Sequence, residues 1–405
     1  MARKLTYGVT APRGFRAGGI HAGVKSSTPE DKLDLALVTA ERPCEAAAVF
    51  TMNRVQAAPV KLSREILAKS GHKLQTVVIN SGNANACAPN DMENARRMVR
   101  ITEQALGIDA ADCAVAVAST GVIGQELNIE AIEKAVPNLA LALAMSEVSA
   151  YKAAEAIMTT DTVRKSLAVQ YNSLGNTITI GAMAKGSGMI HPNMGTLLCV
   201  LTTDADLPAA KLQLALRNAV DVTLNRVSVD GDMSTNDSVF LLGSGYYATQ
   251  YDEFCDALTG LLTSLARMIA SDGEGATHLI TCTVKGAADE YDAETLAKSV
   301  INSSLVKAAI FGADANFGRV LCAIGYTDVD FDPNRVDVEF ASSEGSIEVC
   351  RAGHGIAFNE AKAKQILKEK EIEINVHLHL GQEAATCWGC DLTYDYVKIN
   401  GDYRS

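Results

Sequence analysis

The segment from Ala184 to Ala205 joins a polar loop to a threonine at the head of an apolar run. Gly, Ser, His, Pro and Asn fill the loop, and Thr196 stands directly before the apolar residues 197–201. Loop composition followed by a short apolar run predicts a turn that feeds a buried strand. If the peptide bond before Thr196 were cut, the freed α-amine would become the base beside its own hydroxyl. The pattern makes Thr196 a candidate nucleophile.

Four other segments are rich in small polar residues and are candidates for the loops of a site. They cover residues 80–87, 119–124, 229–238 and 271–277. Each of them alone is more typical of a turn than of a site. The third segment contains Asp-Gly-Asp, but it lacks the spacing and the terminal Glu of an EF-hand, so it does not predict a calcium loop.

A Cys-x-x-Cys pair, Cys387 and Cys390, could serve redox chemistry or half of a metal site. No second pair exists to complete a zinc site, and no βαβ pattern surrounds this one. His377 and His379 alternate on a predicted strand, residues 372–380, and could supply nitrogen ligands. Because the ligand count stays incomplete, structural cysteines are favoured and no metal is expected.

The elements that must position these segments alternate between strand-like and helix-like patterns. The hydrophobic periodicity predicts strands over 35–40, 47–51, 76–80, 114–118 and 371–380. It predicts helices over 91–106, 146–158, 208–223, 253–270 and 360–370, the last with Asn359 as its N-cap. The class is mixed α/β with several strand layers. Neither a glycine-rich dinucleotide motif nor a P-loop is present, which disfavours a Rossmann enzyme.

Length and composition narrow the class of protein further. With 405 residues, 48% hydrophobic and 21% charged, the chain has the composition of a globular protein with two or three lobes. A net charge of −12 argues against a nucleic-acid partner. No apolar run approaches the roughly 20 residues that span a bilayer. The basic N-terminus has no apolar segment behind it, and ten cysteines are too few for a disulfide scaffold, so we expect a cytoplasmic protein without a membrane partner.

Eight motifs follow one another over the whole chain in the order of one known family. They cover residues 8–15, 80–85, 158–162, 185–194, 229–232, 272–277, 314–319 and 388–400. In these motifs the chain closely resembles the ornithine acetyltransferases, also called glutamate N-acetyltransferases, of arginine biosynthesis. The resemblance implies a layered α/β sandwich similar to that of the N-terminal-nucleophile hydrolases.

The resemblance also implies a processing event and a set of site residues. Self-cleavage between Gly195 and Thr196 would give an α chain, residues 1–195, and a β chain, residues 196–405, which stay together as α2β2. Thr196 matches the nucleophile, and Thr120 and Gly121 match the oxyanion hole. The implied substrate contacts are Thr159, Lys185, Thr196, Glu274, Asn400 and Ser405.

The implied reaction moves an acetyl group from N2-acetyl-L-ornithine to L-glutamate through an acetyl-Thr196 intermediate. A freed α-amine with a pKa of about 7.7–8.0 suits the role of base at neutral pH. Lys185 could pair with the α-carboxylate that both substrates carry. No cofactor is expected, and acetyl-CoA stays open as a co-substrate, since members that use it and members that do not share these motifs.

Two positions depart from the family pattern, and two other functions stay open. Gly195 stands where the family has Ala, and Ser405 stands where it more often has Thr. His191 lies in the same loop but is not assigned to catalysis, because the α-amine already fills the base role. The alternatives are an amidohydrolase or aminopeptidase of the same fold and an uncleaved binding protein.

Overall fold

The computed structural model describes residues 3–5, 7–25, 29–191 and 197–402, which form two compact units. The first unit comprises residues 1–186, 192–225 and 233–265, and the second comprises residues 187–191, 226–232 and 266–405. Segments from before and after residue 195 thus enter both units. The boundary between the expected chains 1–195 and 196–405 does not coincide with the boundary between the units, and this division stays a prediction.

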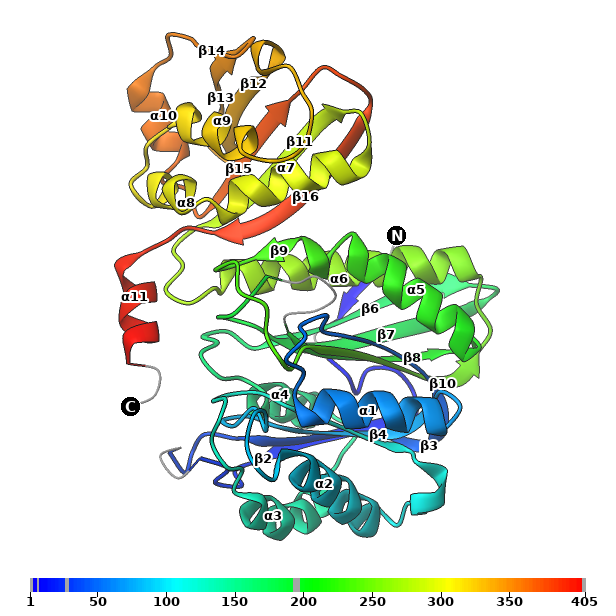
Figure 1. The fold of residues 1–405 in the computed structure, drawn as a ribbon. Helices are drawn as coiled ribbons and strands as arrows, with labels where there is room; N and C mark the ends of the chain where they lie inside the picture. Colours follow the sequence, from blue (N-terminus) through cyan, green and yellow to red (C-terminus); the bar gives the residue numbers. More distant parts are fainter. Residues whose placement is uncertain (1–2, 6, 26–28, 192–196, 403–405) are drawn as a thin grey trace. The chain divides into compact units, whose positions relative to one another are not determined.

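Nine strands of the described residues form one sheet in the first unit, in the order β1-β6-β7-β8-β10-β3-β4-β5, with β2 also paired to β3 (Figure 1). Their bounds are β1 Arg3–Leu5, β2 Phe15–Ile20, β3 Leu35–Phe50, β4 Lys73–Asn80, β5 Val115–Ser119, β6 Lys165–Ser173, β7 Asn176–Lys185, β8 Leu198–Ala205 and β10 Ser238–Tyr247. Strand β8 is buried along its whole length, as the apolar run after Thr196 predicted.

Strand β3 serves two parts of this sheet, and its length is a correction to the sequence analysis. The two strands expected over 35–40 and 47–51 are one strand of 16 residues. Its first part pairs with β2 and β4, its last part pairs with β10, and the register to β4 shifts between Thr39 and Cys44. The residues between the two predicted strands keep extended backbone because neighbouring strands supply their hydrogen bonds.

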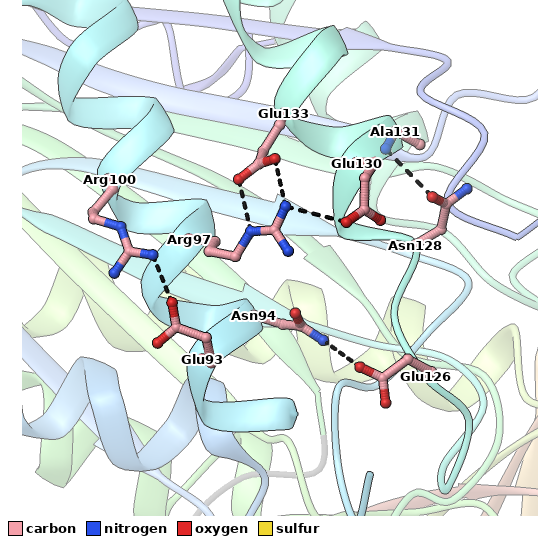
Figure 2. A network of polar contacts seen from close by, with 9 residues as sticks. All are labelled: Glu93, Asn94, Arg97, Arg100, Glu126, Asn128, Glu130, Ala131 and Glu133. Carbon is pink, nitrogen blue, oxygen red and sulfur yellow. Dashed lines mark hydrogen bonds and ion pairs between the residues drawn. The ribbon is translucent and has the colours of Figure 1, made fainter. Parts of the chain in front are cut away.

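Five helices of the described residues pack on this sheet within the first unit, and a sixth is shared. Their bounds are α1 Ala58–Lys69, α2 Asp91–Leu106, α3 Ile129–Leu141, α4 Glu147–Ala156 and α5 Ala209–Asp221, and α6 Tyr251–Ser271 passes from the first unit to the second at residue 265. Helices α2 and α3 lie side by side and are joined by an ion-pair network centred on Arg97 (Figure 2). Its guanidinium binds both carboxylate oxygens of Glu133, at 2.8 and 2.7 Å, and reaches Glu130 at 3.2 Å.

The second unit has a sheet of its own, in the order β14-β13-β12-β15-β11-β16-β9. Its strands are β9 Val227–Ser228, β11 Leu279–Ala287, β12 Asp337–Ser342, β13 Gly345–Arg351, β14 His354–Gly355, β15 Glu371–His377 and β16 Glu383–Cys390. Its helices are α7 Glu290–Asn302, α8 Ser304–Phe311, α9 Phe317–Gly325, α10 Glu360–Ile366 and α11 Tyr394–Gly401. Helix α7 packs on β11 and β16 and shares with them a continuous apolar core.

The mixed α/β class is confirmed, with differences at element ends. Helix α10 stops at Ile366, short of the predicted Lys370, and β15 stops at His377, short of the predicted Leu380. Asn359 is the N-cap of α10, and its side chain accepts the Lys362 N–H at 3.0 Å. Three short 3-10 helices complete the described elements: η1 Ala110–Asp112, η2 Leu224–Arg226 and η3 Pro333–Arg335. Among the described helices, none is long and apolar enough to cross a membrane.

Candidate active site

Two polar loops of the first unit begin where neighbouring parallel strands end. Strands β4 and β5 pair in parallel with Asn80 opposite Ser119, so the loops after them start at the same sheet edge. The Asn80 side chain binds both loops: it accepts the Ser119 hydroxyl at 2.6 Å and donates to the Asn83 carbonyl at 2.9 Å. Asn236 then donates to the carbonyls of Ala84, at 2.6 Å, and Ser119, at 2.9 Å. These amides hold the two loops in one position.

Thr120 and Gly121 lie at the contact between these loops. The Thr120 N–H donates to the Asn80 carbonyl at 3.0 Å, whereas the Thr120 hydroxyl bonds to no group in the described ranges. Gly121 has a φ of +133°, and a Cβ there would stand 2.2 Å from the Gly82 carbonyl carbon. Only glycine permits this approach of backbone to backbone. A free hydroxyl on a rigid, half-buried turn is the kind of donor that an oxyanion hole requires.

Asp161 brings Thr159 and Lys185 together. One of its oxygens accepts the Thr159 N–H at 3.1 Å, and the other accepts the N–H of Gly186, the neighbour of Lys185, at 2.9 Å. The same oxygen pairs with the Lys165 ammonium at 2.7 Å, with both side chains fully buried. Two predicted substrate contacts 26 positions apart in sequence are therefore anchored to one carboxylate.

The charges around Asp161 keep it ionised. Burial would raise the pKa of this carboxyl, but the ammonium groups of Lys185 and Lys165 and the Gly186 N–H hold the pKa at about 2. Lys185 ends β7 and is buried with 7% of its surface exposed. A buried ammonium that shares the Asp161 carboxylate with Lys165 can pair with an incoming carboxylate.

A buried carboxyl, Asp237, stands beside the start of β8. Strands β8 and β10 run parallel, and the Ser238 N–H donates at 3.0 Å to the carbonyl of Leu197, the residue that follows Thr196 in sequence. One oxygen of Asp237 makes no hydrogen bond within the described part of the chain. Burial raises the pKa of Asp237 well above its usual range, although the Ser234 hydroxyl and the Lys185 ammonium both act to lower this pKa. Such a group is a candidate proton carrier.

In the second unit, Glu274 and Asn400 form a second part of the predicted site. The Asn400 amide donates to the Glu274 carboxylate at 2.7 Å and to the Tyr396 carbonyl at 3.1 Å. The carboxylate lies against Gly188, where a Cβ would stand 2.4 Å from its oxygen. The Glu274 N–H also donates to the Ser187 carbonyl at 3.0 Å. Glu274 is 5% exposed, and these contacts hold its carboxyl group in a fixed position.

Asp230 fixes the segment that precedes the predicted cleavage site. Its carboxylate accepts the N–H groups of Met189, at 2.6 Å, and Ile190, at 2.9 Å. The Ile190 carbonyl accepts the Val229 N–H at 2.7 Å. Burial, with the carboxylates of Asp230 and Glu274, raises the pKa of Tyr396, so this phenol stays neutral. The Asp-rich segment 229–238 thus serves as a backbone clamp.

His191 and the Cys-x-x-Cys pair have structural surroundings. The His191 ring contacts the Ser228 hydroxyl at 3.2 Å and the Asn302 amide at 3.4 Å, and burial and Lys298 lower its pKa. Cys387 and Cys390 are buried in β16, and burial raises their pKa values to about 12 and about 11. Thiols with such pKa values are not reactive at neutral pH, as expected for structural cysteines.

The predicted residues divide between the units, and three of them lie outside the described residues. Thr120, Gly121, Thr159 and Lys185 belong to the first unit, and Glu274 and Asn400 to the second. Gly195, Thr196 and Ser405 are not among the described residues, so their roles stay predictions. Asp161 and Asp237 were not among the predicted site residues, although both lie in segments singled out from the sequence. The spacing of Asp161 and Lys165, four residues apart before a strand, was a signal for the first, and the place of Asp237 in the polar segment 229–238 was a signal for the second.

Comparison with known proteins gives one family over nearly the whole chain. The model of the ArgJ family matches residues 16–405. A curated relative from Caldanaerobacter subterraneus subsp. tengcongensis, the arginine biosynthesis bifunctional protein ArgJ, is 49% identical over 98% of each chain. The glutamate N-acetyltransferase of Methanocaldococcus jannaschii is 41% identical over the full length of both.

A solved structure is similar in sequence to half of the chain. It is the ornithine acetyltransferase of Mycobacterium tuberculosis in complex with ornithine, with 40% identity and a TM-score of 0.43. The match covers 49% of the present chain and 100% of that one.

Proposed function

This chain belongs to the ArgJ family, and we propose that it transfers the acetyl group of N2-acetyl-L-ornithine to L-glutamate in arginine biosynthesis. The observation that carries the proposal is identity of 41% to 49% with the named enzymes over 98% or more of the chain. The Thr120 hydroxyl, which has no partner among the described residues, and the buried Lys185 agree with such a reaction. Self-cleavage between Gly195 and Thr196 is part of the proposal.

Each step then has a group to perform it. The Thr196 hydroxyl attacks the acetyl carbonyl, and the freed α-amine of the same residue takes its proton. The Thr120 hydroxyl and the Gly121 N–H stabilise the oxyanion, each such donor contributing about 2.7–4 kcal/mol. The C–N bond breaks as the amine returns the proton to the leaving ornithine nitrogen. The glutamate amine then attacks acetyl-Thr196 by the same steps in reverse.

The two substrates differ in their side chains and in the acetyl group on the α-nitrogen of the donor, and the site residues reflect the side-chain difference. Both carry an α-carboxylate, which the ammonium of Lys185 would bind. The ornithine side chain ends in an ammonium group that the Glu274 carboxylate, held by Asn400, would attract. Glutamate carries a carboxylate instead, which neutral Asn400 and Ser405 would tolerate.

We propose an α2β2 assembly. We also propose that no cofactor is bound, because the threonine supplies both nucleophile and base. All ten cysteines are free thiols, which fits a reducing compartment and hence the cytoplasm. Acetyl-CoA is a candidate second donor, since the bacterial relative is named a bifunctional protein.

Intact mass of freshly purified protein beside a Thr196→Ala control tests the first step. Two chains that meet at Gly195/Thr196, with the control uncut, are expected. An acetyl-transfer assay follows, with acetyl-ornithine or acetyl-CoA as donor. Acetyl-glutamate formation supports the transferase, whereas acetate alone would indicate the amidohydrolase, and an uncut, inactive chain would indicate a binding protein.

A further inference from the structure

Three metal-ligating side chains meet on one face of the second unit, away from Glu274 of the same unit. Asp337 in β12 lies directly opposite His377 in the antiparallel partner β15, and His379 follows two positions later. Directly opposed residues of two paired strands share a face, and the left-handed backbone of His379, just beyond β15, brings its ring against that of His377. The ligand atoms of the three side chains lie within 4.8 Å of one another.

The cluster is at the far end of β11 from Glu274. Glu274 precedes the first residue of β11, Leu279, whereas His377 pairs with Lys285 near the last. It is also separate from the cysteine pair, since Cys387 is buried opposite Cys282. His377 and His379 therefore lie beside the carboxylate of Asp337 and not beside Cys387.

Hydrogen bonds hold Asp337 and the His379 ring, and the His377 ring packs against that of His379. One oxygen of Asp337 accepts the Ala352 N–H at 2.8 Å, and the other contacts His379 Nε2 at 2.7 Å. The two imidazole centroids are 3.7 Å apart. His379 has a left-handed φ of +55°, and its carbonyl accepts the Arg335 guanidinium. Gly286 makes room for the His377 ring, because a Cβ there would stand 2.8 Å from it.

We propose that Asp337, His377 and His379 bind a divalent transition-metal ion, with Zn²⁺ as the representative. Two imidazole nitrogens and one carboxylate oxygen form a common zinc ligand set, at about 2.0–2.2 Å from the ion. The ion replaces the proton between His379 Nε2 and Asp337 Oδ2, and water completes its coordination at this exposed position. An ion pair alone would explain Asp337 and His379 but leaves the second imidazole without a role.

Zinc titration of the tag-free protein, with accessible thiols alkylated, tests the site by calorimetry. The wild-type chain is expected to bind one Zn²⁺ that His379→Asn binds more than about tenfold more weakly. His72→Asn is the matched control, because His72 is also exposed and has a left-handed φ of +64°. Asparagine tolerates that backbone in both variants. His377→Gln and Asp337→Asn, which do not touch a left-handed position, should lose the same ion.

Anomalous diffraction at the zinc edge locates the ion independently of affinity. A peak among the three side chains supports the proposal. A wild-type chain that binds no ion, or equal binding by wild type and His379→Asn, would overturn it.

Discussion

At the scale of single residues, carboxylates that bind backbone N–H groups organise the parts of the proposed site in each unit. Asp161 holds Thr159 and Lys185, and Asp230 holds the segment before the predicted cleavage site. Both bind backbone N–H groups, so each fixes the main chain beside residues of the proposed site. Glu274 differs, because a side-chain amide holds it and leaves its charge available to a substrate.

Replacing Glu274 should separate the two substrates. We expect Glu274→Gln to raise KM for acetyl-ornithine about tenfold and to change KM for glutamate little, because only ornithine carries a side-chain cation. Steady-state kinetics with each substrate varied in turn measure this. Glu383→Gln, at an exposed glutamate, is the control. Equal loss for both substrates would contradict the proposed role.

Removing the charge of Asp161 should destabilise the fold in a pH-dependent way. Its pKa of about 2 lies below the ordinary 3.8, so its ionised form contributes about 2 kcal/mol above pH 4. This stability is lost as the pH falls from 4 to 2. Asp161→Asn removes the carboxylate that pairs with the buried Lys165 ammonium and should cost about 3 kcal/mol at pH 7. Urea unfolding against pH measures both.

The double variant Asp161→Asn/Lys165→Met separates charge from packing. Because it removes both members of the buried pair, it should recover most of the loss of the single variant. If the double variant lost as much free energy of unfolding as the two single variants together, the pair would not act as a unit.

At the scale of elements, ion pairs link the neighbouring helices α2 and α3. Arg97 of α2 reaches two glutamates of α3, whereas Arg100 pairs with Glu93 of its own helix at 2.6 Å (Figure 2). The first contact holds two helices together, and the second holds only one. The two arginines should therefore contribute differently to the free energy of unfolding.

Arg97→Met should lower the free energy of unfolding by about 1 kcal/mol, and Arg100→Met by less than about 0.5 kcal/mol. Arg97 lowers the pKa of Glu133, so its contribution is present above the ordinary value of 4.5 and is lost as the pH falls below it. Denaturant unfolding at pH 7 and pH 3 measures the difference. Equal effects of the two variants at pH 7 would show that the network is not cooperative.

At the scale of the whole molecule, the nine-stranded sheet interlocks the two predicted chains. Strands β8 and β10 follow residue 196, and their neighbours β7 and β3 precede it. Two strand pairs, β7–β8 and β3–β10, would therefore connect the α and β chains through backbone hydrogen bonds.

Cleaved protein should consequently keep both chains together under native conditions. Native mass spectrometry should give a particle that contains both, and separation should require denaturant that unfolds the sheet. An uncleaved Thr196→Ala sample gives the reference mass. Chains that separate in native buffer after cleavage would contradict the interlocked sheet.

The sequence by itself determined the α/β class, fewer than half of the elements and the family, because these depend on local periodicity and on motifs read in order. The helix at 91–106 and the N-cap Asn359 needed nothing beyond neighbouring residues. Only the tertiary structure decided that 35–50 is one strand, since the pairing partners of its middle come from elsewhere in the chain. It alone placed Asp161 between Thr159 and Lys185, and Asp337 beside two histidines, because such meetings depend on strand register across long sequence separations.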